Sequence, residues 1–109
     1  MTINFKKTNY IEASHFLKKL TGTSLTFGEM LEAFRQSEDL SQTDFAKKIG
    51  ISKSHLCDIE KGRKTVSIAR AAEFARRLKY SEKLFITQAL QDQLEEEGFS
   101  YKIGLKKAA

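Results

Sequence analysis

Six basic residues gather in one short stretch of this chain of 109 residues. They are Lys47, Lys48, Lys53, Lys61, Arg63 and Lys64. Only Asp58 and Glu60 oppose them there, so this stretch has a charge of +4 while the whole chain has +5. Such a cluster neutralises phosphates and releases their counterions, which is the chemistry of salt-dependent nucleic-acid binding. Together with a pI near 9.4, it predicts an anionic partner for this stretch.

Two short helices joined by a tight turn are predicted to carry these basic residues. Ser41 begins the first helix with Asp44 three residues later, as in a capping box, and Ser52 is the N-cap candidate of the second. Gly50 ends the first helix at a position that suits a positive φ. One face of each helix is apolar, with Phe45, Ala46 and Ile49 on the first and Leu56 and Ile59 on the second. This pattern predicts a helix-turn-helix.

The outward face of the second helix carries polar and charged side chains. They are Lys53, Ser54, His55 and Asp58. Lys53 and Ser54 fall in the first turn, the end of a recognition helix that enters the major groove, where donors reach base edges. The competing interpretation is that these lysines and arginines only solvate the surface of the helix and bind no nucleic acid.

The stretch SQTDFAKKIGISKSHLCDIEKGRKTVS resembles the helix-turn-helix of the xenobiotic-response-element (XRE), or Cro/C1-type, family of prokaryotic transcription regulators. The resemblance extends over residues 27–78 and implies a sequence-specific DNA-binding regulator. It implies base contacts from Lys53, Ser54 and Asp58, with Ser52 and His55 at the margin.

The same resemblance implies two further sets of residues. Phosphate contacts are implied for Gln42, Lys61, Arg63 and Lys64. A structural ion pair is implied between Arg35 and Glu60. Asp58 departs from the family pattern, because an acid stands where a neutral or basic reader is frequent. It could accept a hydrogen bond from cytosine N4, or it could turn away from the phosphates.

Composition and motifs narrow the other classes of function. The single cysteine, Cys57, excludes an internal disulfide and a cysteine-cluster metal site. His55 and Cys57 diverge on a helix, so they form no nucleophile–base pair, and neither a P-loop nor H-E-x-x-H occurs. We therefore expect no enzyme, no cofactor and no metal. The chain has no apolar run of about 18 residues and no signal-peptide pattern at its start, so we expect a cytoplasmic protein outside the membrane.

The predicted fold is mainly α, a five-helix Cro/C1-type bundle with an extra N-terminal helix and a C-terminal β-strand. Residues 1–25 form an extension of one strand and one helix, which either packs on the domain or binds a partner. Residues 26–80 form the DNA-binding domain, whose first helix starts with the capping box of Thr26 and Glu29. Residues 81–109 add a helix and a strand for dimerisation.

The C-terminal strand is predicted from the alternation of FSYKIGL. Its apolar residues are Phe99, Tyr101, Ile103 and Leu105. A lone strand leaves its backbone unpaired, so it needs an edge, either the N-terminal TINFK segment, a second copy of the chain, or both. A homodimer would place two helices 53–61 about one DNA turn apart, so that they read a palindromic operator.

The favoured interpretation is therefore a homodimeric repressor that occupies its operator. A narrower alternative is an antitoxin similar to those of HigA-like toxin pairs, which binds a toxin protein and represses its own promoter. A third is a protein-interaction adapter that binds no DNA, against which the positive outer face of the second helix argues.

Overall fold

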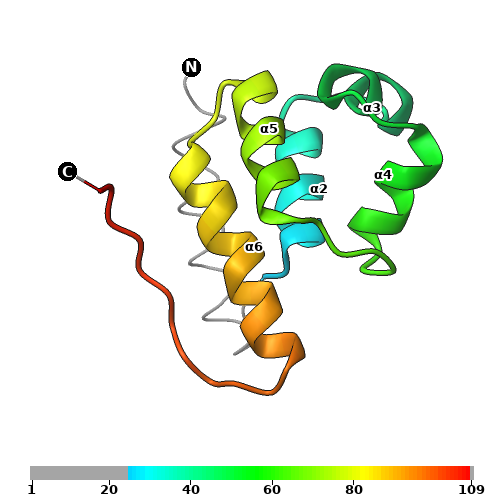
Figure 1. The fold of residues 1–109 in the computed structure, drawn as a ribbon. Helices are drawn as coiled ribbons and strands as arrows, with labels where there is room; N and C mark the ends of the chain where they lie inside the picture. Colours follow the sequence, from blue (N-terminus) through cyan, green and yellow to red (C-terminus); the bar gives the residue numbers. More distant parts are fainter. Residues whose placement is uncertain (1–24, 109) are drawn as a thin grey trace. The chain divides into compact units, whose positions relative to one another are not determined.

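The computed structural model describes residues 25–108 (Figure 1). Within them lie the helices α2 (Phe27–Ser37), α3 (Gln42–Ile49), α4 (Lys53–Glu60), α5 (Ile68–Leu78) and α6 (Glu82–Glu96). The mainly α class is therefore confirmed, and the strand and helix expected before residue 25 lie outside the described residues. Two compact units meet in sequence between Lys64 and Thr65, the first with α2 to α4 and the second with α5 and α6. The domain predicted over 26–80 spans both units.

Each of these helices begins at a hydroxyl side chain, which confirms the N-caps predicted at Thr26, Ser41 and Ser52. Thr26 forms a full capping box, because its Oγ1 accepts from the Glu29 N–H at 3.1 Å and its own N–H donates to Glu29 Oε1 at 2.9 Å. A serine hydroxyl accepts the N–H three residues ahead at the other four starts, Ser41, Ser52, Ser67 and Ser81. These bonds satisfy amides that have no partner inside the helix.

The helix ends also share one arrangement, a left-handed residue closed by two backbone bonds. At the end of α3, Gly50 has φ 82°, its N–H donates to Lys47 O at 3.2 Å, and the Ile51 N–H donates to Ala46 O at 2.9 Å. The left-handed residues of the other four ends are Asp39, Gly62, Lys79 and Gly98. The sequence points to the glycines but gives no signal for Asp39 and Lys79.

In the first unit, α2 and α3 both pack on α4. Their buried apolar side chains are Phe27, Met30, Leu31, Phe34, Phe45, Ala46, Ile49, Leu56 and Ile59. The backbones of α2 and α4 come close together at Gly28, where a Cβ atom would lie 2.0 Å from the carbonyl oxygen of Ile59. Only glycine therefore fits at this position of α2.

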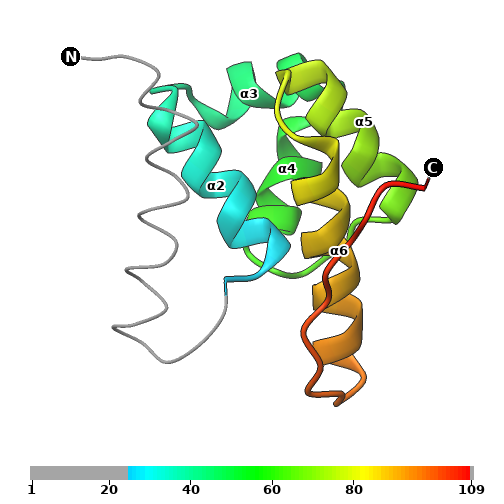
Figure 2. The ribbon, with the colours of Figure 1, turned by 90° about the vertical axis from the view of Figure 1, so that its left-hand side faces the viewer.

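In the second unit, α5 and α6 run antiparallel, side by side (Figures 1 and 2). The buried residues of this unit are Val66, Ala71, Ala72, Phe74, Ala75, Leu78, Phe85 and Ala89. The rings of Tyr80 and Phe85 lie with their centroids 6.2 Å apart, across the short connection between the helices.

The predicted strand over residues 99–105 is absent, and this prediction was wrong for the isolated chain. After Gly98 the tail turns back along α6 without regular secondary structure (Figure 2). Gln91 of α6 holds it, because Nε2 donates to Tyr101 O at 2.7 Å and Oε1 accepts from the Ile103 N–H at 3.0 Å. The side-chain amide of Gln91 thus forms the two hydrogen bonds that one peptide group of a neighbouring strand would form. A ladder needs a whole second strand, which residues 25–108 do not supply.

Gly28→Ala tests the close approach of α2 to α4. Glycine to alanine inside a helix normally stabilises a protein by about 0.5–1 kcal/mol. Here the added Cβ overlaps the Ile59 carbonyl, so we expect the free energy of unfolding in urea to fall by about 2 kcal/mol. Gly104→Ala is the control, since no atom lies within 4 Å of its added Cβ, and should change it by less than about 0.5 kcal/mol. A stabilised Gly28→Ala variant would show that the backbones are farther apart.

Candidate nucleic-acid interface

The first turn of α4 is open to solvent, as its apolar spacing predicts. Leu56 and Ile59 are buried, whereas Lys53 and Ser54 are exposed. The hydroxyl of Ser52 accepts from the His55 N–H at 3.0 Å, so Ser52 serves as the N-cap. The unpaired N–H groups of a first helical turn favour negative charge, and Lys53 adds a full positive charge at the same end. This end of α4 is suited to anionic and electron-rich groups.

The loop after α4 is tied to the helix by backbone bonds around Gly62. Gly62 has φ 79° and donates from its N–H to Ile59 O at 3.1 Å. The Arg63 and Lys64 amides both donate to the carbonyl oxygen of Asp58, at 2.8 and 3.3 Å. The three basic residues expected to contact phosphates, Lys61, Arg63 and Lys64, are exposed in a loop that backbone hydrogen bonds hold against the end of α4.

Two residues expected to contact DNA in different ways are bound to each other. Arg63 Nη1 donates to Asp58 Oδ1 at 2.9 Å, and the side chains are 60% and 27% exposed. The hydrogen bond to the Asp58 carboxylate raises the pKa of the Arg63 guanidinium. The sequence did not predict this pair. Its signal lies in the helix end itself, because the arrangement at Gly62 brings residues five apart into contact.

The basic residues of the stretch 47–64 fall into two groups. Lys48 pairs with Glu38 at 2.8 Å and Arg63 pairs with Asp58. The other four make no ion pair with any residue of 25–108 and are exposed, namely Lys47, Lys53, Lys61 and Lys64. Most of the cluster therefore presents its charge to solvent.

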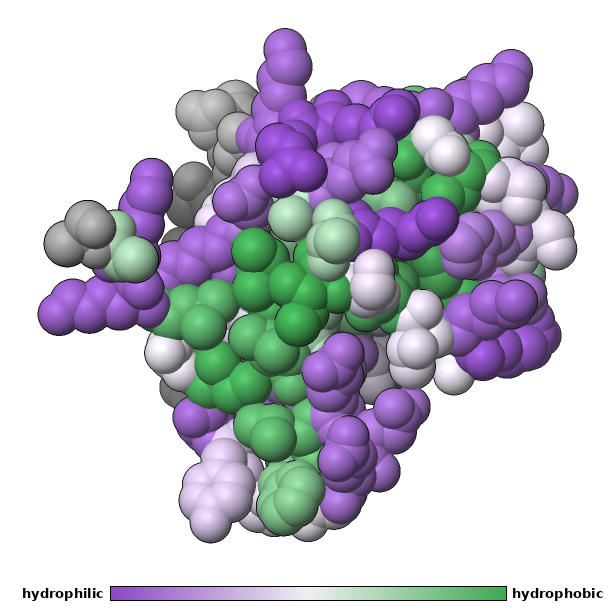
Figure 3. All heavy atoms as spheres, in the orientation of Figure 1, coloured by the Kyte–Doolittle hydropathy of each residue, from purple (hydrophilic) through white to green (hydrophobic). Residues whose placement is uncertain are grey.

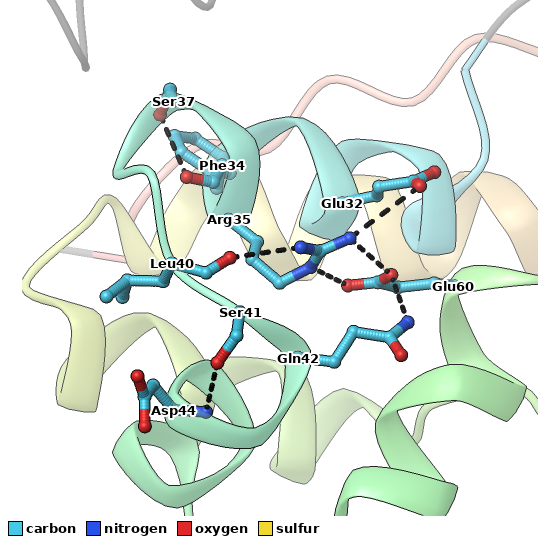
Figure 4. A network of polar contacts seen from close by, with 9 residues as sticks. All are labelled: Glu32, Phe34, Arg35, Ser37, Leu40, Ser41, Gln42, Asp44 and Glu60. Atoms are coloured by element: carbon cyan, nitrogen blue, oxygen red, sulfur yellow. Dashed lines mark hydrogen bonds and ion pairs between the residues drawn. The ribbon is translucent and has the colours of Figure 1, made fainter.

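One buried carboxylate connects α2, α3 and α4 (Figure 4). Glu60, at the end of α4, has a side chain only 2% exposed. Its Oε2 accepts from Arg35 Nε of α2 at 2.8 Å, and its Oε1 accepts from Arg35 Nη2 at 3.1 Å and from Gln42 Nε2 of α3 at 2.9 Å. Arg35 also donates from Nη1 to Leu40 O at 3.0 Å. The ion pair implied for Arg35 and Glu60 is thus present as a bidentate contact, with Gln42 as a third member.

This network includes Arg35 and Gln42, two residues for which the resemblance implies a role. The hydrogen bond to Glu60 raises the pKa of Arg35, against the opposing effect of burial, so the guanidinium stays charged. Gln42 places one amide N–H on Glu60, and its half-buried side chain has a second N–H. Its phosphate contact therefore stays a prediction that would use this second N–H.

Two arginines near the end of α5 pair with carboxylates of the same unit. Arg76 pairs with Glu82 at 2.7 Å and Arg77 with Glu73 at 3.1 Å, all within the second unit.

In the part of the chain that the structure describes, no three side chains of His, Cys, Asp or Glu come together as metal ligands. None of its helices combines the length and the apolar character that crossing a membrane requires.

A family model for the helix-turn-helix matches residues 31–85, which is about half of the chain and extends from α2 to the start of α6. No curated protein and no solved structure matches the chain.

Glu60→Ala should destabilise the fold by about 3 kcal/mol, because it leaves the guanidinium of Arg35 partly buried without its carboxylate. The measurement is the free energy of unfolding in urea. Glu73→Ala is the control, since its exposed pair with Arg77 should contribute less than about 1 kcal/mol. The double variant Arg35→Ala/Glu60→Ala should lose less than the sum of the two single losses. Equal effects of Glu60→Ala and Glu73→Ala would show that the network does not hold the three helices together.

Proposed function

From the premise that this chain belongs to the XRE-type helix-turn-helix family of DNA-binding regulators, we propose that it is a repressor that binds a palindromic operator as a homodimer. The observation that carries this proposal is the open, cationic first turn of α4. Around it, the described lysines without carboxylate partners are free to neutralise phosphates.

In this proposal α4 lies in the major groove with its first turn against the bases. Lys53 and Ser54 donate to base edges, and Lys53 suits guanine O6 and N7. Lys61, Arg63 and Lys64 contact phosphates from the loop after α4, with Gln42 at the start of α3. The rigid support of α4, through Gly28 and the Glu60 network, suits a helix whose side chains must meet fixed base positions.

Lys53→Ala and Lys64→Ala separate the two kinds of contact. Lys53→Ala should cost about 1–3 kcal/mol on the selected operator and relax discrimination at one position of each half-site. Lys64→Ala should weaken all duplexes alike and reduce the slope of log K against log salt by about 0.9. The measurement is a salt-titrated gel shift on an operator selected from a random pool and on its single-base variants. An operator preference unchanged by Lys53→Ala would refute its role as a base reader.

The dimer part of the proposal rests on the tail. Phe99 and Tyr101 are 50% and 69% exposed, while Gln91 pairs with the tail backbone at only one donor and one acceptor. Hydrophobic residues also gather over α6 in the space-filling view (Figure 3), where Leu84, Leu90 and Leu94 are half-buried. The tail of a second copy would cover this apolar surface and supply the strand edge that the isolated chain lacks. Phe99, Tyr101, Ile103 and Leu105 are the proposed contacts.

The double variant Phe99→Ser/Tyr101→Ser should shift the protein from dimer to monomer. Light scattering after size-exclusion chromatography should give twice 12.4 kDa for the wild type and 12.4 kDa for the variant over a dilution series. Ser100→Ala, at the intervening exposed position, should stay dimeric. A wild type that is monomeric at every concentration, or a variant that stays dimeric, would exclude dimerisation through the tail.

Two other functions remain to be separated by experiment. An antitoxin of the HigA-like kind would bind DNA in the same way and would use the exposed tail or another surface for a toxin. A short basic toxin-like reading frame beside the gene would support it. An adapter without specific DNA binding would not distinguish the gene's own upstream duplex from random duplex at any salt concentration.

A further inference from the structure

Asp58 is connected to the loop after α4 at three points. Its carbonyl oxygen accepts from the Arg63 and Lys64 amides, and its carboxylate accepts from the Arg63 guanidinium at 2.9 Å. The left-handed conformation of Gly62 makes the backbone bonds possible. Asp58 therefore fixes both the position of the loop and the direction of the Arg63 side chain.

This contact affects how the loop can meet DNA. A phosphate offers Arg63 the same kind of acceptor that the carboxylate of Asp58 already provides. Arg63 therefore either exchanges this carboxylate for a phosphate, or offers a phosphate its remaining N–H groups while its charge is already balanced by Asp58. In both cases it releases less binding free energy than the lysines beside it, which have no carboxylate to leave.

We propose that Asp58 is a positioning residue that competes with DNA phosphates for Arg63 and so restrains the affinity of the α4 surface for DNA of any sequence. This inference rests on the proposed function and deepens it. Weaker sequence-independent binding helps a regulator to discriminate its operator, because phosphate contacts strengthen binding to every competing site. Asp58 then acts through Arg63, and Lys53 and Ser54 are left as the base readers. The acid that departs from the family pattern has a reason to be present at this position.

Asp58→Ala is the direct test, with a random-sequence duplex as the probe and salt between about 50 and 200 mM. An exposed ion pair is worth up to about a fivefold change in equilibrium, so the variant should bind this duplex about threefold to fivefold more tightly at the lowest salt. One more free guanidinium should steepen the slope of log K against log salt by about 0.9. Asp58→Asn keeps the side-chain shape and should change both quantities in the same direction by a smaller amount.

Two controls separate this effect from a simple change in net charge. Glu96→Gln removes one exposed carboxylate at the end of α6 and should change the affinity less than twofold with no change in slope. In the background of Arg63→Ala, removing Asp58 should gain less than twofold. A role of Asp58 in stability alone would leave the salt slope unchanged.

The outcomes distinguish this inference from the proposed function. If Asp58→Ala and Asp58→Asn both behave like Glu96→Gln while Lys64→Ala weakens binding, the restraint is refuted and the DNA-binding function stands. The restraint is refuted as well if Asp58→Ala gains as much affinity without Arg63 as with it. If the wild type binds no duplex at the lowest salt, both proposals are overturned. A threefold or larger gain that depends on Arg63, with a steeper slope, supports the restraint.

Discussion

A buried negative charge at the end of α4 links α2, α3 and α4 to one another. The Glu60 carboxylate is almost fully removed from water, and it stands at a helix C-terminus, where the helix dipole is also negative. Its burial is tolerated because Arg35 supplies an opposite charge through two hydrogen bonds and Gln42 supplies a third bond. Since each partner belongs to a different helix, a displaced α2 would leave the charge of Glu60 without compensation, and a displaced α3 would remove one of its hydrogen bonds.

The surface that this network supports has an uneven distribution of charge. Lys53, Lys61 and Lys64 have no carboxylate partner among the described residues, whereas Arg63 is paired with Asp58. A sum of the charges along the sequence counts these lysine and arginine side chains as equal. Their effect on a phosphate differs, because a paired guanidinium must first leave its partner. The loop geometry that creates this difference depends on a single left-handed residue, Gly62.

The tail has the alternating pattern of a β-strand, but residues 25–108 offer it no second strand to pair with. The alternation over residues 99–105 led to the prediction of a strand, and the pattern is real, but hydrogen bonding requires a second strand to pair with. Within the described residues the only substitute is the side-chain amide of Gln91, which satisfies one carbonyl and one N–H. The aromatic side chains of the tail stay exposed as a result. Pattern alone therefore indicates what a segment can join, while the available partners decide whether it becomes a strand.

The sequence by itself determined the local features, because these depend on residues a few positions apart. The hydroxyl caps, the glycine ends, the inward positions of Leu56 and Ile59 and the basic stretch could all be predicted from such spacing. Tertiary structure decided the rest. The need for glycine at position 28 arises from the carbonyl of Ile59, and the third bond of Glu60 comes from Gln42 on another helix. Asp39 and Lys79 adopt left-handed conformations without a glycine signal, because the backbone bonds that close each helix end offset a modest strain. The contacts of Gly28 with Ile59 and of Gln42 with Glu60 join residues far apart in the sequence, and short-range patterns carry no information about them.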